Sequence, residues 1–347
     1  MKVAMYYNNK DIRLEEMPTP KIGPEEFLVK VMASGICGTD VLEWYRIKTA
    51  PRVLGHEMAG EIVEVGENVK KYKKGDSVFA THHVPCNTCH YCLNGHHTAC
   101  DTLHHTNYDP GGFAEYIRIP AINVDRGTFI LPGAMSYEVA TFIEPLGCVA
   151  RGQRLMQMTP GSTVLIIGSG ISGLLHLKLA KVMKAEKIIT ADINEYRLKK
   201  SLEFGADAVI NANKSIPERL REINKGKLSD IVIVCTGAQQ ACTQALQCVE
   251  PGGTILFFAV PKPGIDIPVP ISDLWRNEVR MITSYGAAPN DLAEALELLA
   301  THRVEVEDMV THRLPLEETG KGFQLVASAG ESIKIIIEPH GYGGKLC

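Results

Sequence analysis

Hydrophobic positions in the first 150 residues fall in short runs that are rich in β-branched residues or alternate with polar ones. Glycine, proline and asparagine bound these runs, which is typical of short strands joined by turns. The pattern predicts strands at 27–32, 61–65 and 112–117, within a β-rich first domain that covers residues 1–150.

From about residue 151 the pattern changes, and strand-like apolar runs alternate with segments of helical periodicity. Such alternation indicates βαβ units in a parallel, doubly wound sheet, and hence an α/β fold. The predicted strands lie at Thr163–Ile167, 187–191, 208–210, 231–235 and 254–259, and the predicted helices at 174–182 and 196–204. After residue 285 the pattern predicts one more helix, at 291–301, and a final strand at 333–338.

A glycine-rich turn follows the first of these strands and opens a helix. Its sequence is Gly168-Ser169-Gly170-Ile171-Ser172-Gly173. Glycines allow a tight turn and a close approach of the backbone to a pyrophosphate, and the helix N-terminus supplies N–H groups to the phosphate. We therefore expect this turn to bind a dinucleotide. The alternative is a glycine turn that only packs a helix against a sheet.

A carboxylate lies where this fingerprint requires one. Asp192 is nineteen residues beyond the last glycine, at the end of the next predicted strand, where it can accept hydrogen bonds from a ribose diol. Its negative charge would repel a 2′-phosphate, so the sequence predicts NAD rather than NADP as the cofactor. Arg197 leaves NADP open, because a nearby arginine can receive that phosphate.

The composition and net charge serve mainly to exclude classes of protein. The 347 residues are 45% hydrophobic and 22% charged, as in an ordinary globular protein. A formal net charge of −4 argues against a nucleic-acid partner or a basic membrane-binding patch. No run of about 18 apolar residues predicts a membrane span, and the N-terminus lacks the apolar segment of a signal peptide. We expect a soluble, cytoplasmic protein without nucleic-acid or membrane partners.

Four of the ten cysteines lie within one short segment. They are Cys86, Cys89, Cys92 and Cys100. Four thiolates on one loop are typical of a closed, tetrahedral structural zinc site, which leaves no position for a substrate. Reduced cysteines without a metal are the alternative, and His90, His96 and His97 could compete as ligands. Of the neighbouring histidines, 82, 83, 104 and 105 are expected to be solvated or to pack behind the ligands.

A second metal site is predicted from residues far apart in the sequence. Cys37 follows the strand at 27–32, His56 and Glu57 lie nineteen and twenty residues later, and Glu144 precedes the nucleotide domain. Each has an ordinary structural explanation when taken alone. Together, one cysteine, one histidine and one or two carboxylates form an open zinc site with room for a substrate oxygen. Cys148, four residues after Glu144, could compete as a ligand.

In these motifs the chain resembles the zinc-dependent medium-chain alcohol dehydrogenases over essentially its whole length. The matching segments begin at Cys37-Gly-Thr-Asp, Gly55-His-Glu, Cys86, Gly111-Gly-Phe-Ala-Glu-Tyr, Glu144-Pro-Leu, Gly168 and Ser284-Tyr-Gly. The Glu144-Pro-Leu segment is similar to sorbitol and other polyol dehydrogenases and to threonine dehydrogenases. The resemblance implies a GroES-like catalytic domain (1–150), an NAD-binding Rossmann domain (151–285) and a C-terminal segment (286–347) that returns to the catalytic domain.

The resemblance also implies roles for individual residues. Cys37 and His56 would bind a catalytic zinc, with Glu57 as a ligand that can leave and return and Glu144 bound directly or through water. Thr39 would relay the proton of the alcohol. The nicotinamide would lie against Thr236, Ala259 and Val260, and the substrate pocket would include Trp44, Ser284 and Tyr285. By the same resemblance we expect two Zn²⁺ ions per chain, an active site in a cleft between the domains, and a dimer or tetramer.

Two positions depart from the family pattern. Leu42 stands where many polyol and threonine dehydrogenases have a histidine that carries the proton outward, and Ser284 stands where animal sorbitol dehydrogenases have an arginine. The expected activity is reversible hydride transfer between NAD and a secondary alcohol in a small polyol. Three alternatives stay open: oxidation of an amino alcohol such as threonine, carbonyl reduction as the physiological direction, and a zinc-ribbon binding protein with an inactive site.

Overall fold

A computed structural model describes residues 1–341 of the chain and divides them into two compact units. Unit 1 runs from Met1 to Gly147 and resumes at Gly286, and unit 2 is Cys148–Tyr285. Unit 2 is therefore an insertion between two parts of unit 1. Within residues 1–341, no helix combines the length and the apolar character that a bilayer crossing requires.

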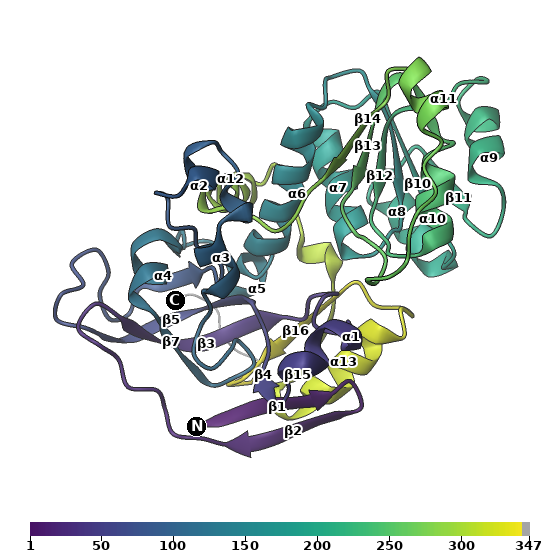
Figure 1. Ribbon diagram of the computed structural model, residues 1–347. Coiled ribbons are helices and arrows are strands. Elements are labelled where there is room, and N and C mark those ends of the chain that lie inside the picture. The colour runs from purple at the N-terminus through teal and green to yellow at the C-terminus, as the bar shows by residue number, and fades with distance from the viewer. Residues whose placement is uncertain (342–347) are drawn as a thin grey trace. The chain divides into compact units, whose positions relative to one another are not determined.

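Unit 1 is built on two mainly antiparallel sheets, in which β15 and β16 form a parallel pair (Figure 1). The larger sheet has the order β15-β16-β3-β5-β6-β8, with β7 also paired to β3, and the smaller one has the order β2-β1-β4. The strands are β1 Lys2–Asn8, β2 Asp11–Glu16, β3 Phe27–Gly35, β4 Arg52–Val53, β5 Glu57–Val65, β6 Ser77–Ala80, β7 Tyr116–Ile119, β8 Thr128–Ile130, β15 Val310–Pro315 and β16 Lys334–Glu338.

Short helices connect these strands, and one buried apolar cluster holds the unit together. This core includes Phe27, Met58, Phe113, Phe323 and Ile335, none of them more than 1% exposed. The helices of the unit are α1 Glu43–Arg46, α2 His90–Leu93, α3 Asp101–His105, α4 Ala121–Arg126, α5 Tyr137–Ala140, α12 Pro289–Ala300 and α13 Thr319–Ala327. A longer helix, α6 (Ile143–Met156), contains the point of division between the units.

Unit 2 is a six-stranded parallel sheet with the order β11-β10-β9-β12-β13-β14. Its strands are β9 Thr163–Ile167, β10 Lys187–Asp192, β11 Ala208–Asn211, β12 Ser229–Val234, β13 Val249–Phe257 and β14 Arg280–Thr283. Its helices are α7 Ile171–Val182, α8 Glu195–Glu203, α9 Ile216–Ile223, α10 Gln239–Ala245 and α11 Ile271–Arg276. The strand β9, with the sequence TVLII, is fully buried, and an unbroken apolar run follows its first residue, Thr163. The strand order is that of the Rossmann fold, as predicted.

The sequence pattern was wrong in two places. The strand expected at 112–117 begins only at Tyr116, because residues 112 and 113 donate their backbone N–H groups to Gly55 and Leu54 instead of entering a regular ladder. After residue 285 the pattern predicted one helix and one strand, whereas the structure adds β15 and α13, whose pattern is interrupted by Pro315 and by glycines.

Candidate active site and metal centres

The four cysteines of the segment 86–100 converge on one point. Their Sγ atoms all lie within 4.8 Å of one another, with separations of 3.5 Å for Cys89–Cys92, 3.6 Å for Cys100–Cys86 and 4.0 Å for Cys86–Cys92. With Zn–S bonds of about 2.3 Å, the corners of a tetrahedron are about 3.8 Å apart. The sulfur positions therefore fit a zinc ion at their centre, as the sequence predicted.

The ionisation of these cysteines is consistent with a metal site. Hydrogen bonds from the Thr88 side chain and from the backbone N–H groups of Thr88 and Cys89 lower the pKa of Cys86 to about 5. Burial instead raises the pKa of Cys92 to about 12. A buried thiol of this kind becomes a thiolate when a cation takes the proton's place. His90, His96 and His97 lie outside this group of sulfur ligands.

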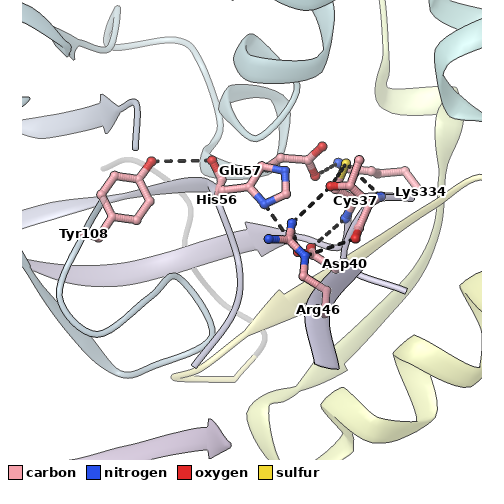
Figure 2. Close-up of polar contacts among 8 residues, drawn as sticks. Cys37, Asp40, Arg46, His56, Glu57, Tyr108 and Lys334 are labelled. Carbon is pink, nitrogen blue, oxygen red and sulfur yellow. Dashed lines mark hydrogen bonds and ion pairs between the residues drawn. The ribbon is translucent and has the colours of Figure 1, made fainter. Parts of the chain in front are cut away.

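A second cluster of ligand atoms joins Cys37, His56 and Glu57 (Figure 2). Cys37 follows β3, and His56 and Glu57 lie at the start of β5. Because β3 and β5 are antiparallel neighbours with Gly35 opposite Glu57, the end of one strand lies beside the beginning of the other. One ligand atom from each residue lies within 4.8 Å of the others. The set of thiolate, imidazole and carboxylate matches an open catalytic zinc site.

Asp40 holds the imidazole of His56. Its Oδ1 lies 3.3 Å from His56 Nδ1 and 3.2 Å from Arg46 Nη2, and its Oδ2 accepts the backbone N–H of Cys37 at 3.1 Å (Figure 2). Burial opposes the ionisation of Asp40, but His56 and Arg46 outweigh it and keep the pKa of Asp40 below its ordinary value. Since Nδ1 faces Asp40, Nε2 is the nitrogen left to bind a metal.

Glu57 forms a buried ion pair that the sequence did not predict. Its Oε2 contacts Lys334 Nζ from β16, and the side chains are 1% and 0% exposed (Figure 2). A Cβ atom at Gly35 would lie 2.6 Å from this carboxylate oxygen, so only glycine leaves room for the pair. Glu57 thus has two competing cationic partners: Lys334 and a metal held by Cys37 and His56.

Glu144 lies on the same unit but outside the group of three ligands. It is 8% exposed in the first turn of α6, and with Glu57 it raises the pKa of Tyr108, after the larger effect of burial. The Tyr108 hydroxyl lies 3.4 Å from the carbonyl oxygen of His56. The role of Glu144 as a metal ligand, direct or through water, therefore stays a prediction.

Two histidines of the cysteine-rich region lie behind the ligand His56. The ring centroid of His82 is 4.8 Å from that of His56 and 3.8 Å from that of His83. Burial lowers the pKa of His82 well below its ordinary value and that of His83 to about 4. His104 and His105 instead contact the carbonyl oxygens of Thr98 and Asp101. The contact of His82 with His56, a residue of the second cluster, was not predicted from the sequence.

The predicted proton relay, Thr39, and one predicted pocket residue, Trp44, follow Cys37 closely along the chain. Thr39 Oγ1 donates to Cys37 Sγ at 3.3 Å and accepts from Arg46 Nη2 at 3.2 Å. Trp44 is 36% exposed on α1, and Leu42 is 38% exposed. Ser284 and Tyr285 are the last residues of unit 2, so their place in a pocket with Trp44 stays a prediction.

The glycine-rich turn of unit 2 has the geometry of a phosphate-binding turn. Gly168 has φ +99°, and a Cβ there would lie 3.1 Å from the backbone of Cys235. A Cβ at Gly173 would overlap the carbonyl oxygen of Gly168. Between them, Gly170 caps α7, and Ile171 and Ser172 form its first turn with free N–H groups. The loops carrying Thr236 and Ala259–Val260 also follow the carboxyl ends of strands β12 and β13.

Asp192 ends β10, beside this turn. Its Oδ2 accepts the backbone N–H of Ser169 at 2.6 Å, and its Oδ1 accepts that of Asn194 at 2.9 Å. Each oxygen keeps a lone pair for a ribose hydroxyl. The Arg197 guanidinium lies beside the same turn, with Nη1 3.9 Å from where a Cβ of Gly170 would be. Both residues therefore lie beside the glycine turn, and their roles in binding NAD or NADP stay predictions.

Sequence reasoning missed three residues of the catalytic centre. Asp40 was noted only as part of a motif, and Arg46 and Lys334 were not considered. Asp40 could have been found, because a carboxylate three residues from a ligand cysteine is a candidate partner for a ligand histidine. Lys334 carried no signal, because it lies 277 residues from Glu57.

Comparison with known proteins agrees with this geometry. Residues 23–126 match the family model of the alcohol dehydrogenase GroES-like domain, and residues 172–301 match that of zinc-binding dehydrogenases. The chain belongs to the zinc-dependent medium-chain alcohol dehydrogenase family. It is an oxidoreductase of small-molecule alcohols, with zinc and a nicotinamide dinucleotide as cofactors.

Similar relatives cover nearly the whole chain. An L-threonine 3-dehydrogenase of Bacillus licheniformis is 33% identical over 94% of both chains, and a sorbitol dehydrogenase of Bacillus subtilis is 31% identical over 98% of both. Among solved structures, an alcohol dehydrogenase from Thermus sp. ATN1 has a TM-score of 0.86 at 29% identity, covering 97% of this chain and 99% of its own. Galactitol-1-phosphate dehydrogenase from Escherichia coli has 0.86 at 25% identity, with coverage of 98% and 100%.

Proposed function

We propose that this protein transfers a hydride reversibly between a secondary alcohol of a small polyol and NAD, giving a ketone. The observation that carries the proposal is the cluster of Cys37, His56 and Glu57. The carboxylate of Glu144 is near this cluster, since Glu144 and Glu57 both raise the pKa of Tyr108. A metal shell with one thiolate and carboxylates is harder than one with two thiolates. It suits a substrate that offers vicinal hydroxyls to the metal and its waters.

Each residue of the site has a distinct role in the proposed reaction. When bound, zinc supplies a Lewis acid that lowers the pKa of a substrate hydroxyl, and NAD supplies the hydride acceptor. Cys37, His56 and Glu57 would hold the metal, and Asp40 orients His56. Thr39 would accept the proton of the alcohol, with its hydroxyl fixed by Arg46. Leu42 has no group that can carry that proton, so the proton must leave by a route that does not use residue 42.

The finer properties belong to the same proposal. NAD is favoured over NADP because Asp192 places a negative charge beside the turn that binds the dinucleotide. A cytoplasmic location is supported by nine cysteines without a disulfide among the described residues, since thiolate metal sites persist in reducing compartments. We also propose a homo-oligomer, a dimer or tetramer, by family resemblance, and light scattering of the purified protein measures it.

A substrate panel tests the activity. Absorbance at 340 nm would be followed with NAD and with NADP on sugar alcohols, vicinal diols, L-threonine and aliphatic primary alcohols of equal length. We expect the highest kcat/KM on the vicinal diols and sugar alcohols. Equal or better kcat/KM on the simple primary alcohols would contradict the proposal. Strong selectivity for threonine would replace the polyol by an amino alcohol.

A further inference from the structure

Two arginines lie beside the catalytic cluster, and in the first of them, Arg46, only some of the N–H groups have an acceptor. Arg46, at the end of α1, donates from Nε to the carbonyl oxygen of Thr39 at 3.1 Å and from Nη2 to Thr39 Oγ1. The same Nη2 also donates to Asp40 Oδ1 (Figure 2). Its other terminal nitrogen, Nη1, has no acceptor among residues 1–341. Arg46 therefore positions the catalytic loop and keeps one edge of its guanidinium available.

The second arginine has no partner at all in the described part of the chain. Arg52 lies on β4, four residues before His56, and its side chain is half-buried. Only burial and charges at a distance act on it: burial and Arg46 lower the pKa of Arg52, and Tyr45 and Asp40 raise it. A partly desolvated guanidinium without a carboxylate is unusual, because burial of an unpaired charge is costly.

Asp40 is the carboxylate whose charge acts on Arg52, and it is already engaged, as are two other carboxylates of this unit. Asp40 is shared between His56 and Arg46, and Glu57 is paired with Lys334. Glu43, on α1, accepts the backbone N–H of Asn9 at 3.2 Å. Both guanidinium groups therefore lie on the side of the metal ligands formed by α1 and β4, and among residues 1–341 no carboxylate pairs with Arg52.

We propose that the natural substrate carries an anionic group, a carboxylate or a phosphate, which Arg52 binds together with the Nη1 edge of Arg46. This inference rests on the proposed alcohol dehydrogenase function and narrows its substrate to an acidic polyol derivative. Guanidinium groups match both anions because they present N–H donors in a planar fork. The reacting hydroxyl would bind at Cys37, His56 and Glu57, and the anion would lie toward α1 and β4.

Matched substrates test the proposal on the zinc-loaded enzyme. A hexitol, the phosphate ester of the same hexitol and the corresponding hexonate differ mainly in charge. We expect kcat/KM for one of the two anions to exceed that for the hexitol by about tenfold or more, an advantage that falls as salt is added. The anionic substrate with the higher kcat/KM identifies the anion as phosphate or carboxylate. Equal values for all three would overturn the inference while leaving the polyol activity in place.

Variants locate the effect. Arg52→Gln should remove most of the anion's advantage through a higher KM, and Arg52→Lys should retain part of it. Arg13→Gln, an exposed arginine of β2 paired with Asp11, is the matched control and should keep the advantage. If Arg52→Gln lowers kcat/KM for charged and neutral substrates equally, the role of Arg52 is structural. If it instead raises the KM for NAD alone, the anion is the cofactor's pyrophosphate. Either result would overturn the proposal.

Direct binding covers the case in which no alcohol in the panel is oxidised. Calorimetry would then measure the binding of inorganic phosphate and of the hexonate to wild-type protein and to Arg52→Gln and Arg52→Lys, with melting curves to confirm that each variant is folded. Binding that weakens about tenfold in Arg52→Gln and partly recovers in Arg52→Lys supports the anion site even though the activity proposal has failed. Equal binding in all three proteins, or none, overturns it.

Discussion

At the scale of single residues, the ion pair between Glu57 and Lys334 places two opposite charges in the buried interior beside the metal ligands. Both side chains are at most 1% exposed, in a space that exists because residue 35 is a glycine. Removing one member of a buried pair leaves the other charge without compensation, which is strongly destabilising. The pair therefore links the metal ligands of β5 to the last strand of the sheet, β16.

Lys334→Met should accordingly lower the free energy of unfolding by about 3–5 kcal/mol in metal-depleted protein. The loss should be smaller in zinc-loaded protein, where the metal offers Glu57 a second cationic partner. Urea unfolding with and without zinc measures both values. Lys321→Met is the control, because its pair with Glu318 is 60% and 43% exposed and should change stability by about 1 kcal/mol at most. Equal losses in the two variants would contradict a special role for the buried pair.

Asp192 is the residue that should decide the cofactor. Asp192→Asn removes its charge but keeps an oxygen to accept one of the two backbone N–H groups, so the glycine turn should stay intact. We expect the ratio of kcat/KM for NAD to that for NADP to fall by about tenfold, the effect of roughly 1.4 kcal/mol. Asp230→Asn is a matched control, since Asp230 accepts the N–H of Thr163 at the opposite end of β9. A wild-type preference for NADP would show that Arg197 dominates.

At the scale of elements, the two zinc sites differ in how they are built. The four cysteines come from one loop around α2 and α3, so that site is local in sequence and closed. The catalytic ligands come from the end of β3 and the start of β5, and are held in place by residues from α1 and β16. Loss of the first site should lower the stability of the fold, and loss of the second should abolish turnover.

Cys92→Ser and Cys37→Ser separate these roles. Each should leave one zinc per chain, compared with two in the wild type. We expect Cys92→Ser to lower Tm by roughly 10 °C, because a structural metal contributes directly to folding. Cys37→Ser should stay folded and lose turnover. Cys242→Ala, at a buried cysteine of unit 2, should keep both metals. Metal analysis, melting curves and absorbance at 340 nm measure the three properties, and at most one zinc in active wild-type protein would contradict the two-site assignment.

The same contrast between local and distant contacts explains what could be predicted from the sequence. The cysteine site and the glycine turn are short motifs whose spacing implies their geometry, and the Rossmann sheet follows from alternating strands and helices. The pair of Glu57 with Lys334 could not be predicted, because its members are 277 residues apart and neither belongs to a motif of the other. Arg52 was missed for a different reason: its significance lies in the absence of a partner among residues 1–341, which only the structure reveals.

At the scale of the whole molecule, the insertion of unit 2 into unit 1 sets the order in which the catalytic centre is completed during synthesis. At about 5–20 residues per second, the ribosome adds Lys334 roughly 14 to 55 seconds after Glu57. Throughout that interval β3 lacks its neighbour β16, whereas the cysteines at 86–100 and all the strands of unit 2 are synthesised within it, before Lys334. The nascent chain can therefore take up its structural metal early, whereas the reactive centre becomes complete only after its last strand has been translated.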